Sequence, residues 1–186
     1  ELAPLTLAGS MPFVPVNISA AGAAPDGLSV SSPSPELLAQ PAALAHPEAV
    51  LWDQPLSAID QSAWVNQEFS DFPTYSSWLA DDFSNTGTWL VNTIFVPGDG
   101  WNGFTSLLNA SALTWQIYAD DGTGVPDGDP SGGGNPPVWT LTLPPLDSHV
   151  IITIGSGGLL SDVTLNPPMS IVLPPGDWWL VFYPTL

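Results

Sequence analysis

The 186-residue chain contains 18 acidic residues and neither lysine nor arginine, so its formal net charge is −18. This composition excludes nucleic-acid binding, which depends on cations that displace counterions, and it disfavours an anionic membrane surface for the same reason. With 44% hydrophobic residues the sequence still has enough apolar surface for a proper core, and none of its apolar runs is long enough to cross a bilayer.

The sequence contains no cysteine, so disulfide bonds contribute nothing to its stability. It begins at Glu1 rather than at methionine, which suggests a processed end such as the one left by signal-peptide removal. It also offers no cleavage site to trypsin-like proteases, which suits exposure outside the cell. We therefore expect an extracellular protein, either secreted or held at the cell surface.

Residues 1–47 form an N-terminal arm that is rich in Ala, Pro, Ser and Leu. Within it the segment 12–18 alternates, with Val14, Val16 and Ile18 on one face, and this pattern predicts an extended strand. Proline has no backbone N–H to donate to a ladder. We therefore expect this strand to lie at a sheet edge or to pair on one side only.

Residues 48–186 form the domain proper, in which short apolar segments alternate with turn residues. Helical periodicity is nearly absent, although the pattern near 57–65 is compatible with a short helix. The predicted strands are 49–52, 79–83, 89–96, 113–118, 138–143, 149–154, 159–165, 170–173 and 178–183. Their close spacing predicts an all-β fold, an antiparallel jelly-roll-like β-sandwich that carries an extended N-terminal arm.

Three motifs within residues 49–186 carry a resemblance to a known type of domain. They are the sequences ADDF at 80–83, IYADDG at 117–122 and LPPGDWWL at 173–180. In this order they resemble a secreted bacterial jelly-roll-like module found in extracellular and surface-anchored proteins, although Asp177 stands where that family more often has a small residue or Thr. The resemblance implies the same fold, and its motifs are hallmarks of the fold rather than of catalysis.

An acidic loop follows the strand 113–118 and holds the densest cluster of carboxylates in the sequence. Its members are Asp120, Asp121, Asp127 and Asp129. Calcium prefers several oxygen ligands, which a loop of Asp and Gly supplies, so these four residues are candidate Ca²⁺ ligands. The alternative is that Asp and Gly are simply turn formers, and the spacing does not fit an EF-hand. Any cofactor other than this Ca²⁺ is not indicated.

Asp81 and Asp82 form a second acidic pair, within the predicted strand 79–83. Successive side chains of a strand point to opposite faces, so one of the two must point inward. A buried carboxylate favours a hydrogen-bonding or metal-binding role over an unpartnered one.

The nine tryptophans suggest a carbohydrate-binding surface, since exposed aromatic rings stack on sugars. Trp178 and Trp179 are adjacent in a strand, so one should enter the core and the other should face outward. Trp101 lies in a Gly-rich turn and is also expected to be exposed. Most of the other tryptophans are expected to fill the core. Trp101 and Trp179 are therefore the candidate sugar-stacking residues.

Catalysis finds little support in the sequence. There is no cysteine nucleophile, and Gly155-Ser156-Gly157 lacks the spacing of a nucleophile elbow. His46 and His149 stand alone, and zinc would need more His or Cys than this. We expect a protein that is not an enzyme.

The N-terminal arm is the feature of the sequence that most directly suggests a function, namely self-assembly. Its apolar strand either folds back on its own sheet or pairs with the open edge of a neighbouring subunit, through residues Phe13, Val14, Val16 and Ile18. Repeated head to tail, the second arrangement builds a fibre without salt bridges. The leading hypothesis is therefore a structural subunit of an extracellular bacterial filament, a self-assembling homopolymer. The alternative is a secreted carbohydrate-binding or surface-adhesion module with a polysaccharide partner.

Overall fold

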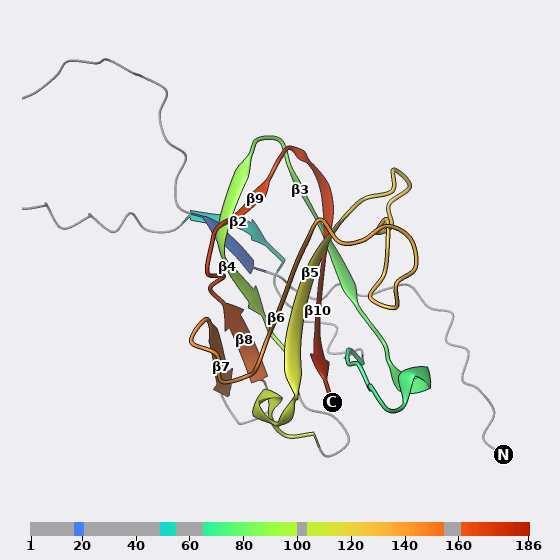
Figure 1. Ribbon diagram of the computed structural model, residues 1–186. Helices are drawn as coiled ribbons and strands as arrows, with labels where there is room; N and C mark the ends of the chain where they lie inside the picture. The colour runs from blue at the N-terminus through green and yellow to red at the C-terminus, as the bar shows by residue number, and fades with distance from the viewer. Residues whose placement is uncertain (1–16, 21–48, 55–64, 100–103, 155–160) are drawn as a thin grey trace, which may run out of the picture.

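The computed structural model describes residues 17–20, 49–54, 65–99, 104–154 and 161–186. They form two antiparallel β-sheets packed face to face, which confirms the predicted β-sandwich (Figure 1). The strands are β1 (Asn17–Ala20), β2 (Ala49–Asp53), β3 (Ala80–Asn85), β4 (Trp89–Val96), β5 (Ala112–Ala119), β6 (Trp139–Leu143), β7 (Val150–Ile154), β8 (Ser161–Leu165), β9 (Ile171–Leu173) and β10 (Gly176–Thr185). Two single 3-10 turns, η1 (Pro73–Tyr75) and η2 (Leu107–Asn109), interrupt them. No helix in the described part of the chain has the length and apolar character needed to cross a membrane.

The larger sheet has six strands in the order β2-β1-β4-β8-β7, with β9 also paired to β4. The smaller sheet has four strands in the order β3-β10-β5-β6. All the pairs between these strands are antiparallel. The chain passes from one sheet to the other between β2 and β3, β3 and β4, β4 and β5, β6 and β7, and β9 and β10. β10 is central to the smaller sheet because it pairs with β3 along one side and with β5 along the other.

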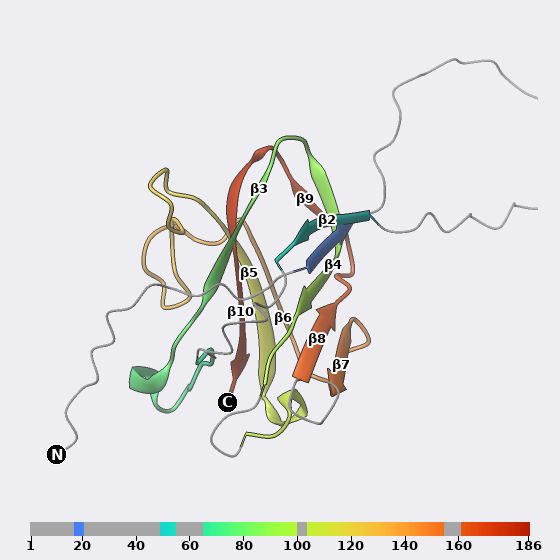
Figure 2. The same cartoon turned by 180° about the vertical axis from the view of Figure 1, so that it is seen from behind.

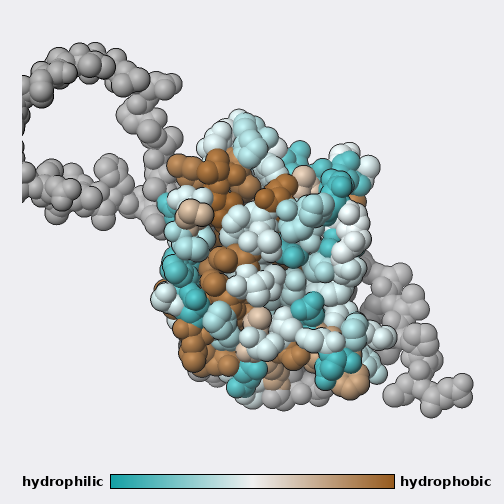
Figure 3. All heavy atoms as spheres, in the orientation of Figure 1, coloured by the Kyte–Doolittle hydropathy of each residue, from teal (hydrophilic) through white to brown (hydrophobic). Residues whose placement is uncertain are grey.

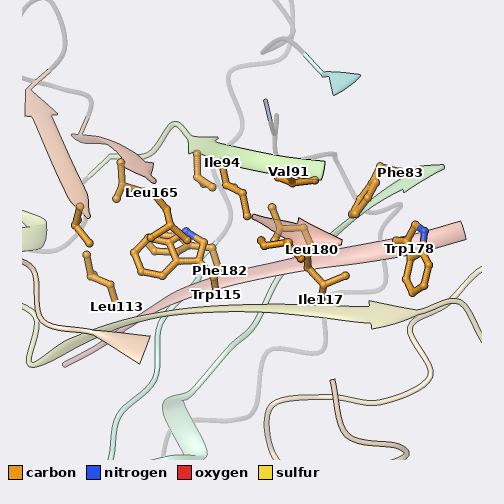
Figure 4. Close-up of a cluster of buried hydrophobic side chains, with 14 of the residues drawn as sticks. Phe83, Val91, Ile94, Leu113, Trp115, Ile117, Leu165, Trp178, Leu180 and Phe182 are labelled. Carbon is orange, nitrogen blue, oxygen red and sulfur yellow. The ribbon is translucent and has the colours of Figure 1, made fainter. Parts of the chain in front are cut away.

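The main core lies between the two sheets (Figure 4). Alternate residues of β5, namely Leu113, Trp115 and Ile117, point into it and are fully buried, as the alternation of this segment predicts. Leu180 and Phe182 of β10 enter the same core, and the Trp115 and Phe182 rings pack with their centroids 5.0 Å apart. Burying a large apolar side chain of this kind stabilises the fold by about 1.5–3 kcal/mol.

The outer face of the smaller sheet is also covered, which the alternation in β5 did not predict. Tyr118, Val181 and Tyr183 are buried there in a second apolar cluster, against Trp78 and Trp179. The segment 65–79 contributes Trp78 to this cover. It is anchored by the backbone of Glu68, whose N–H donates to the Pro184 carbonyl at 2.8 Å and whose carbonyl accepts from the Leu186 N–H at 2.8 Å.

The arm contributes β1, and its position differs from the prediction. β1 lies between β2 and β4 and pairs with both, so it is an inner strand rather than an edge strand (Figure 2). The physical reason is that the ladder uses residues 17–20, which follow Pro12 and Pro15 and contain no proline. Every residue of β1 therefore has a backbone N–H to donate.

Candidate functional site

The acidic loop is built from turns in which three of the four carboxylates accept hydrogen bonds from nearby backbone N–H groups. At its start, Asp120 Oδ1 accepts hydrogen bonds from the N–H of Gly122 at 2.7 Å and of Gly124 at 3.3 Å. Asp121 Oδ1 accepts from the N–H and the hydroxyl of Thr123, both at 2.7 Å. Gly122 has a φ of 87°, which a residue with a Cβ rarely adopts. These are the Asx-turns that Asp and Gly favour.

The same arrangement recurs at the far end of the loop. Asp129 Oδ1 accepts from the N–H of Ser131 at 2.7 Å, from the Ser131 hydroxyl and from the N–H of Gly133 at 3.3 Å. These bonds, the Ser131 hydroxyl first, lower the pKa of Asp129. Asp127 Oδ2 accepts from the Asn135 side chain at 2.7 Å. Each of the four candidate carboxylates therefore has a local donor.

The four carboxylates do not assemble into a metal centre. Among the described residues, which include all four, no three acidic or histidine side chains come together in a way that could hold a metal ion. The bonds described above instead support the alternative reading, in which these aspartates shape turns. The predicted Ca²⁺ site thus gains no support from the geometry.

Asp120 also ties the loop to the sheet. Its Oδ2 accepts a hydrogen bond of 2.9 Å from the indole Nε1 of Trp179 on β10. This bond is the main cause that lowers the pKa of Asp120, with smaller contributions from the Gly122 and Gly124 backbone. Beside it, burial first and then Tyr183 and Asp129 raise the pKa of Tyr118 to about 12, so this phenol stays protonated at neutral pH.

The two adjacent tryptophans of β10 point to opposite faces, as predicted. Trp178 enters the main core, and Trp179 packs on the outer cluster of the smaller sheet. Trp179 is only partly exposed and its N–H is bonded to Asp120, so part of its sugar-stacking surface is already used. The other candidate, Trp101, lies outside the described residues.

Two other aromatic side chains are more exposed than Trp179, and the sequence reasoning missed them. Phe72 is 60% exposed and Tyr75 is 70% exposed. Tyr75 ends the turn η1 and Phe72 immediately precedes it, and the Tyr75 N–H donates to the Phe72 carbonyl at 3.0 Å. The signal in the sequence is the Phe-Pro pair at 72–73, because proline favours a turn and a turn presents its flanking side chains to solvent.

Asp81 is the inward member of the acidic pair, as the alternation requires. It is 3% exposed, whereas Asp82 is only partly buried. Neither carboxylate oxygen of Asp81 accepts a hydrogen bond of normal geometry. Burial first, and then the negative charge of Asp82, raise the pKa of Asp81 to about 7, while the backbone N–H of Asp82 offsets a small part of this rise.

Of the four predicted self-assembly residues, the structure describes only one. Phe13, Val14 and Val16 lie outside the described residues. Ile18 belongs to β1, where its backbone pairs with Trp52 of β2 and Ile94 of β4.

His149 immediately precedes β7, and the shortest hydrogen bond of its side chain is to Asp147. Its Nδ1 lies 2.8 Å from Asp147 Oδ1, and its backbone N–H donates to the same oxygen at 2.9 Å. The backbone bond first, and then the imidazole, lower the pKa of Asp147. The His149–Asp147 contact lies within the loop before β7. Among the described residues it is not part of a larger group of catalytic side chains.

Hydrophobic side chains gather on the side of the molecule where β4, β8 and β9 lie (Figure 3). Leu90 of β4 and Val172 of β9 are cross-strand partners that are 41% and 61% exposed. Ile151 of β7 is 49% exposed. The larger sheet thus leaves apolar side chains in contact with solvent.

A scan against protein-family models found no match, and comparisons with curated proteins and with solved structures likewise found none. The functional proposal therefore depends on the geometry of this chain alone.

Proposed function

We propose that this protein is a structural subunit of an extracellular bacterial filament, in which β1 of one subunit inserts into the larger sheet of the next. The observation that carries the proposal is the place of β1 between β2 and β4, paired on both sides. A strand donated by a second copy to this place would make the same backbone ladder. It would therefore gain the hydrogen bonds of two neighbours instead of one.

The connection between β1 and β2 is long enough for such an exchange. Residues 21–48 separate the two strands in the sequence. A segment of this length spans up to roughly 90 Å when fully extended, whereas an antiparallel pair needs a turn of only a few residues. The same ladder can thus be closed within one chain or between two chains.

Strand insertion also suits the charge of the chain. With a net charge of −18 and no Lys or Arg, two copies repel each other and have no lysine or arginine for salt bridges between subunits. Backbone hydrogen bonds and apolar contacts do not depend on such pairs. The exposed Leu90 on β4 and Val172 on β9 add apolar surface on the strand that pairs with β1 and on its neighbour.

The experiment uses the purified full chain and a chain that lacks residues 1–20. Negative-stain electron microscopy and light scattering should show filaments for the full chain and none for the truncated chain. A synthetic peptide of residues 12–20, added in excess to the full chain, should shorten the filaments because it occupies the place of β1. A full chain that stays monomeric at high concentration contradicts the proposal.

A point variant separates the ladder from other effects of the arm. Ser19→Pro removes one backbone donor from β1, which pairs with Val50 and Thr93 at this position, whereas Ser19→Ala keeps the donor. We expect Ser19→Pro to weaken assembly and Ser19→Ala to leave it unchanged. Equal effects of the two variants would speak against a backbone ladder.

A second candidate function is carbohydrate binding, which the exposed Phe72 and Tyr75 favour. Rings held on a short turn and open to solvent are suited to stacking on sugar rings. This candidate predicts retention on insoluble polysaccharides that is lost in Phe72→Ala and Tyr75→Ala. Trp179→Ala is expected to have a smaller effect, because that ring is already packed and bonded.

A further inference from the structure

The buried carboxylate of Asp81 lies where the two sheets meet along one side of the sandwich. On β3 it shares its face with Phe83 and Asn85, both of which are buried between the sheets. Its cross-strand partner on β10 is Leu180, which is 2% exposed. The immediate surroundings of Asp81 on its own sheet are therefore apolar or uncharged on this face.

The end of β2 meets β3 at Asp82, the residue that follows Asp81. The side-chain Nε2 of Gln54, which follows β2, donates a hydrogen bond of 3.2 Å to the backbone carbonyl of Asp82. Two buried atoms of this end, Gln54 Oε1 and Trp52 Nε1, lack a hydrogen-bond partner, as the Asp81 oxygens do. This contact between the sheets therefore contains several buried polar atoms that lose their hydrogen bonds to water on folding and gain none within the protein.

The strand β2, which forms this contact between the sheets, has few partners. Among the described strands, β2 pairs only with β1, so it contacts the rest of the larger sheet through a four-residue neighbour. Local opening of a strand with so few partners costs less than global unfolding. Such an opening would part the end of β2 from β3 at Asp82, the residue next to Asp81.

We propose that Asp81 is a proton-operated latch, which keeps β2 closed against β3 while its carboxyl group is protonated and lets this side of the sandwich open when it ionises. An ionised carboxylate without a hydrogen bond is costly in an apolar interior, and hydration removes the cost. The proposal concerns the folded domain and does not depend on filament assembly.

Few charged groups act on this carboxyl. Asp82 is the neighbour on β3, and its negative charge adds to the effect of burial. β10 presents Leu180 opposite Asp81, and the end of β2 contributes the neutral Gln54 beside the exposed Asp53. No Lys or Arg side chain offsets the charge, because the sequence has neither residue.

The direction of the pH dependence follows from the raised pKa. Asp81 titrates near 3.8 in the unfolded chain and near 7 in the folded one. Its contribution to stability is therefore fully present below about pH 4, and it is lost as the pH rises through the folded-state pKa near 7. Within this window the folding equilibrium constant falls by up to about tenfold per pH unit from this group alone.

The test compares the full wild-type chain with Asp81→Asn, whose neutral amide mimics the protonated acid. The control is Asp71→Asn, which removes the same charge from an exposed position. In urea denaturation, the free energy of unfolding of wild type and of Asp71→Asn should fall between about pH 4 and pH 7, relative to that of Asp81→Asn. Hydrogen exchange, corrected for intrinsic rates, should show protection of residues 49–54 and 80–85 falling with pH in wild type and holding in Asp81→Asn.

Parallel pH profiles for wild type and Asp81→Asn would overturn the proposal. If Asp81→Asn does not fold, the carboxyl ¹³C resonance of Asp81 in the wild-type chain decides the matter. A titration midpoint near 7 together with pH-dependent exchange of β2 supports the latch. A midpoint near 4, or exchange of β2 that is independent of pH, overturns it.

Discussion

The indole Nε1 of Trp178 donates a hydrogen bond of 2.9 Å to Oδ1 of Asn85 inside the sandwich. The side-chain Nδ2 of the same asparagine donates hydrogen bonds to three backbone carbonyls, those of Gly87 at 2.7 Å, Leu173 at 3.2 Å and Pro174 at 2.9 Å. One buried side chain thus joins the turn after β3, the turn before β10 and the core tryptophan. Asn85 is 7% exposed, so water cannot readily replace these bonds.

We expect Asn85→Ala to lower the free energy of unfolding by about 2–4 kcal/mol, because it leaves the Trp178 N–H and several carbonyls without a partner in the interior. Denaturant titration measures this change. The control is Asn135→Ala, since Asn135 is exposed and its side chain bonds Asp127 at the surface. A loss for Asn85→Ala no larger than for the control would contradict the role assigned to Asn85.

Trp115 and Trp178 offer a matched comparison of two buried indoles. Trp115 Nε1 has no hydrogen-bond partner, whereas Trp178 Nε1 is bonded to Asn85. Replacement by Phe removes similar volume at both sites, but only Trp178→Phe breaks a bond and leaves an acceptor unpaired. We expect Trp178→Phe to cost about 1–2 kcal/mol more than Trp115→Phe in thermal or urea unfolding. Equal losses would mean that the Trp178–Asn85 bond contributes little.

Gly128 lies where two parts of the acidic loop approach each other closely. A Cβ added there would lie 2.0 Å from the backbone carbonyl oxygen of Asn135, so the backbone must move. We expect Gly128→Ala to lower the free energy of unfolding by about 1–3 kcal/mol. Gly87→Ala is the control, since a Cβ there meets nothing within 4 Å. Comparable unfolding midpoints for the two variants would refute this close contact.

The bond between Trp179 and Asp120 should depend on pH. Because the folded-state pKa of Asp120 is lowered from 3.8, its stabilising contribution is present above that value and is lost as the pH falls through the lower folded-state pKa. We expect the indole N–H resonance of Trp179 to shift in acid in wild type but not in Asp120→Asn. Asp121→Asn, which affects only the turn at Thr123, should titrate like wild type. An indole signal that does not respond to acid would show that this bond is not formed in solution.

The alternation of apolar residues was sufficient to predict the strands, and the segment 89–96 was predicted with its observed bounds. The burial of Thr114 and Tyr118 could not be predicted, because they lie on the outer face of β5. Their partners come from other parts of the chain: Thr114 bonds the Thr142 hydroxyl on β6, and Tyr118 lies in a cluster with Trp78 and Trp179. The inner position of β1 was missed for a similar reason, since prolines next to a strand obscure a proline-free ladder of four residues.

For the acidic loop, composition alone identified the cluster but did not distinguish ligands from turn formers. The difference depends on where each oxygen points, as at Asp120 and Asp129, which bond the N–H groups two and four residues later. For Asp81, strand alternation did predict the inward direction. The sequence could not show that its oxygens lack a hydrogen bond of normal geometry, because the residue opposite it comes from β10, which is distant in the sequence.

The central place of β10 also sets the order in which the fold can be completed during synthesis. β3 and β5 do not pair with each other, and each pairs with β10, which is made last of the described strands. Asp81 and its cross-strand partner Leu180 are far apart in the sequence. Most of the contacts in the smaller sheet likewise join residues far apart along the chain. Such a topology folds slowly, and the edges of β3 and β5 that pair with β10 stay unpaired on the ribosome until β10 emerges.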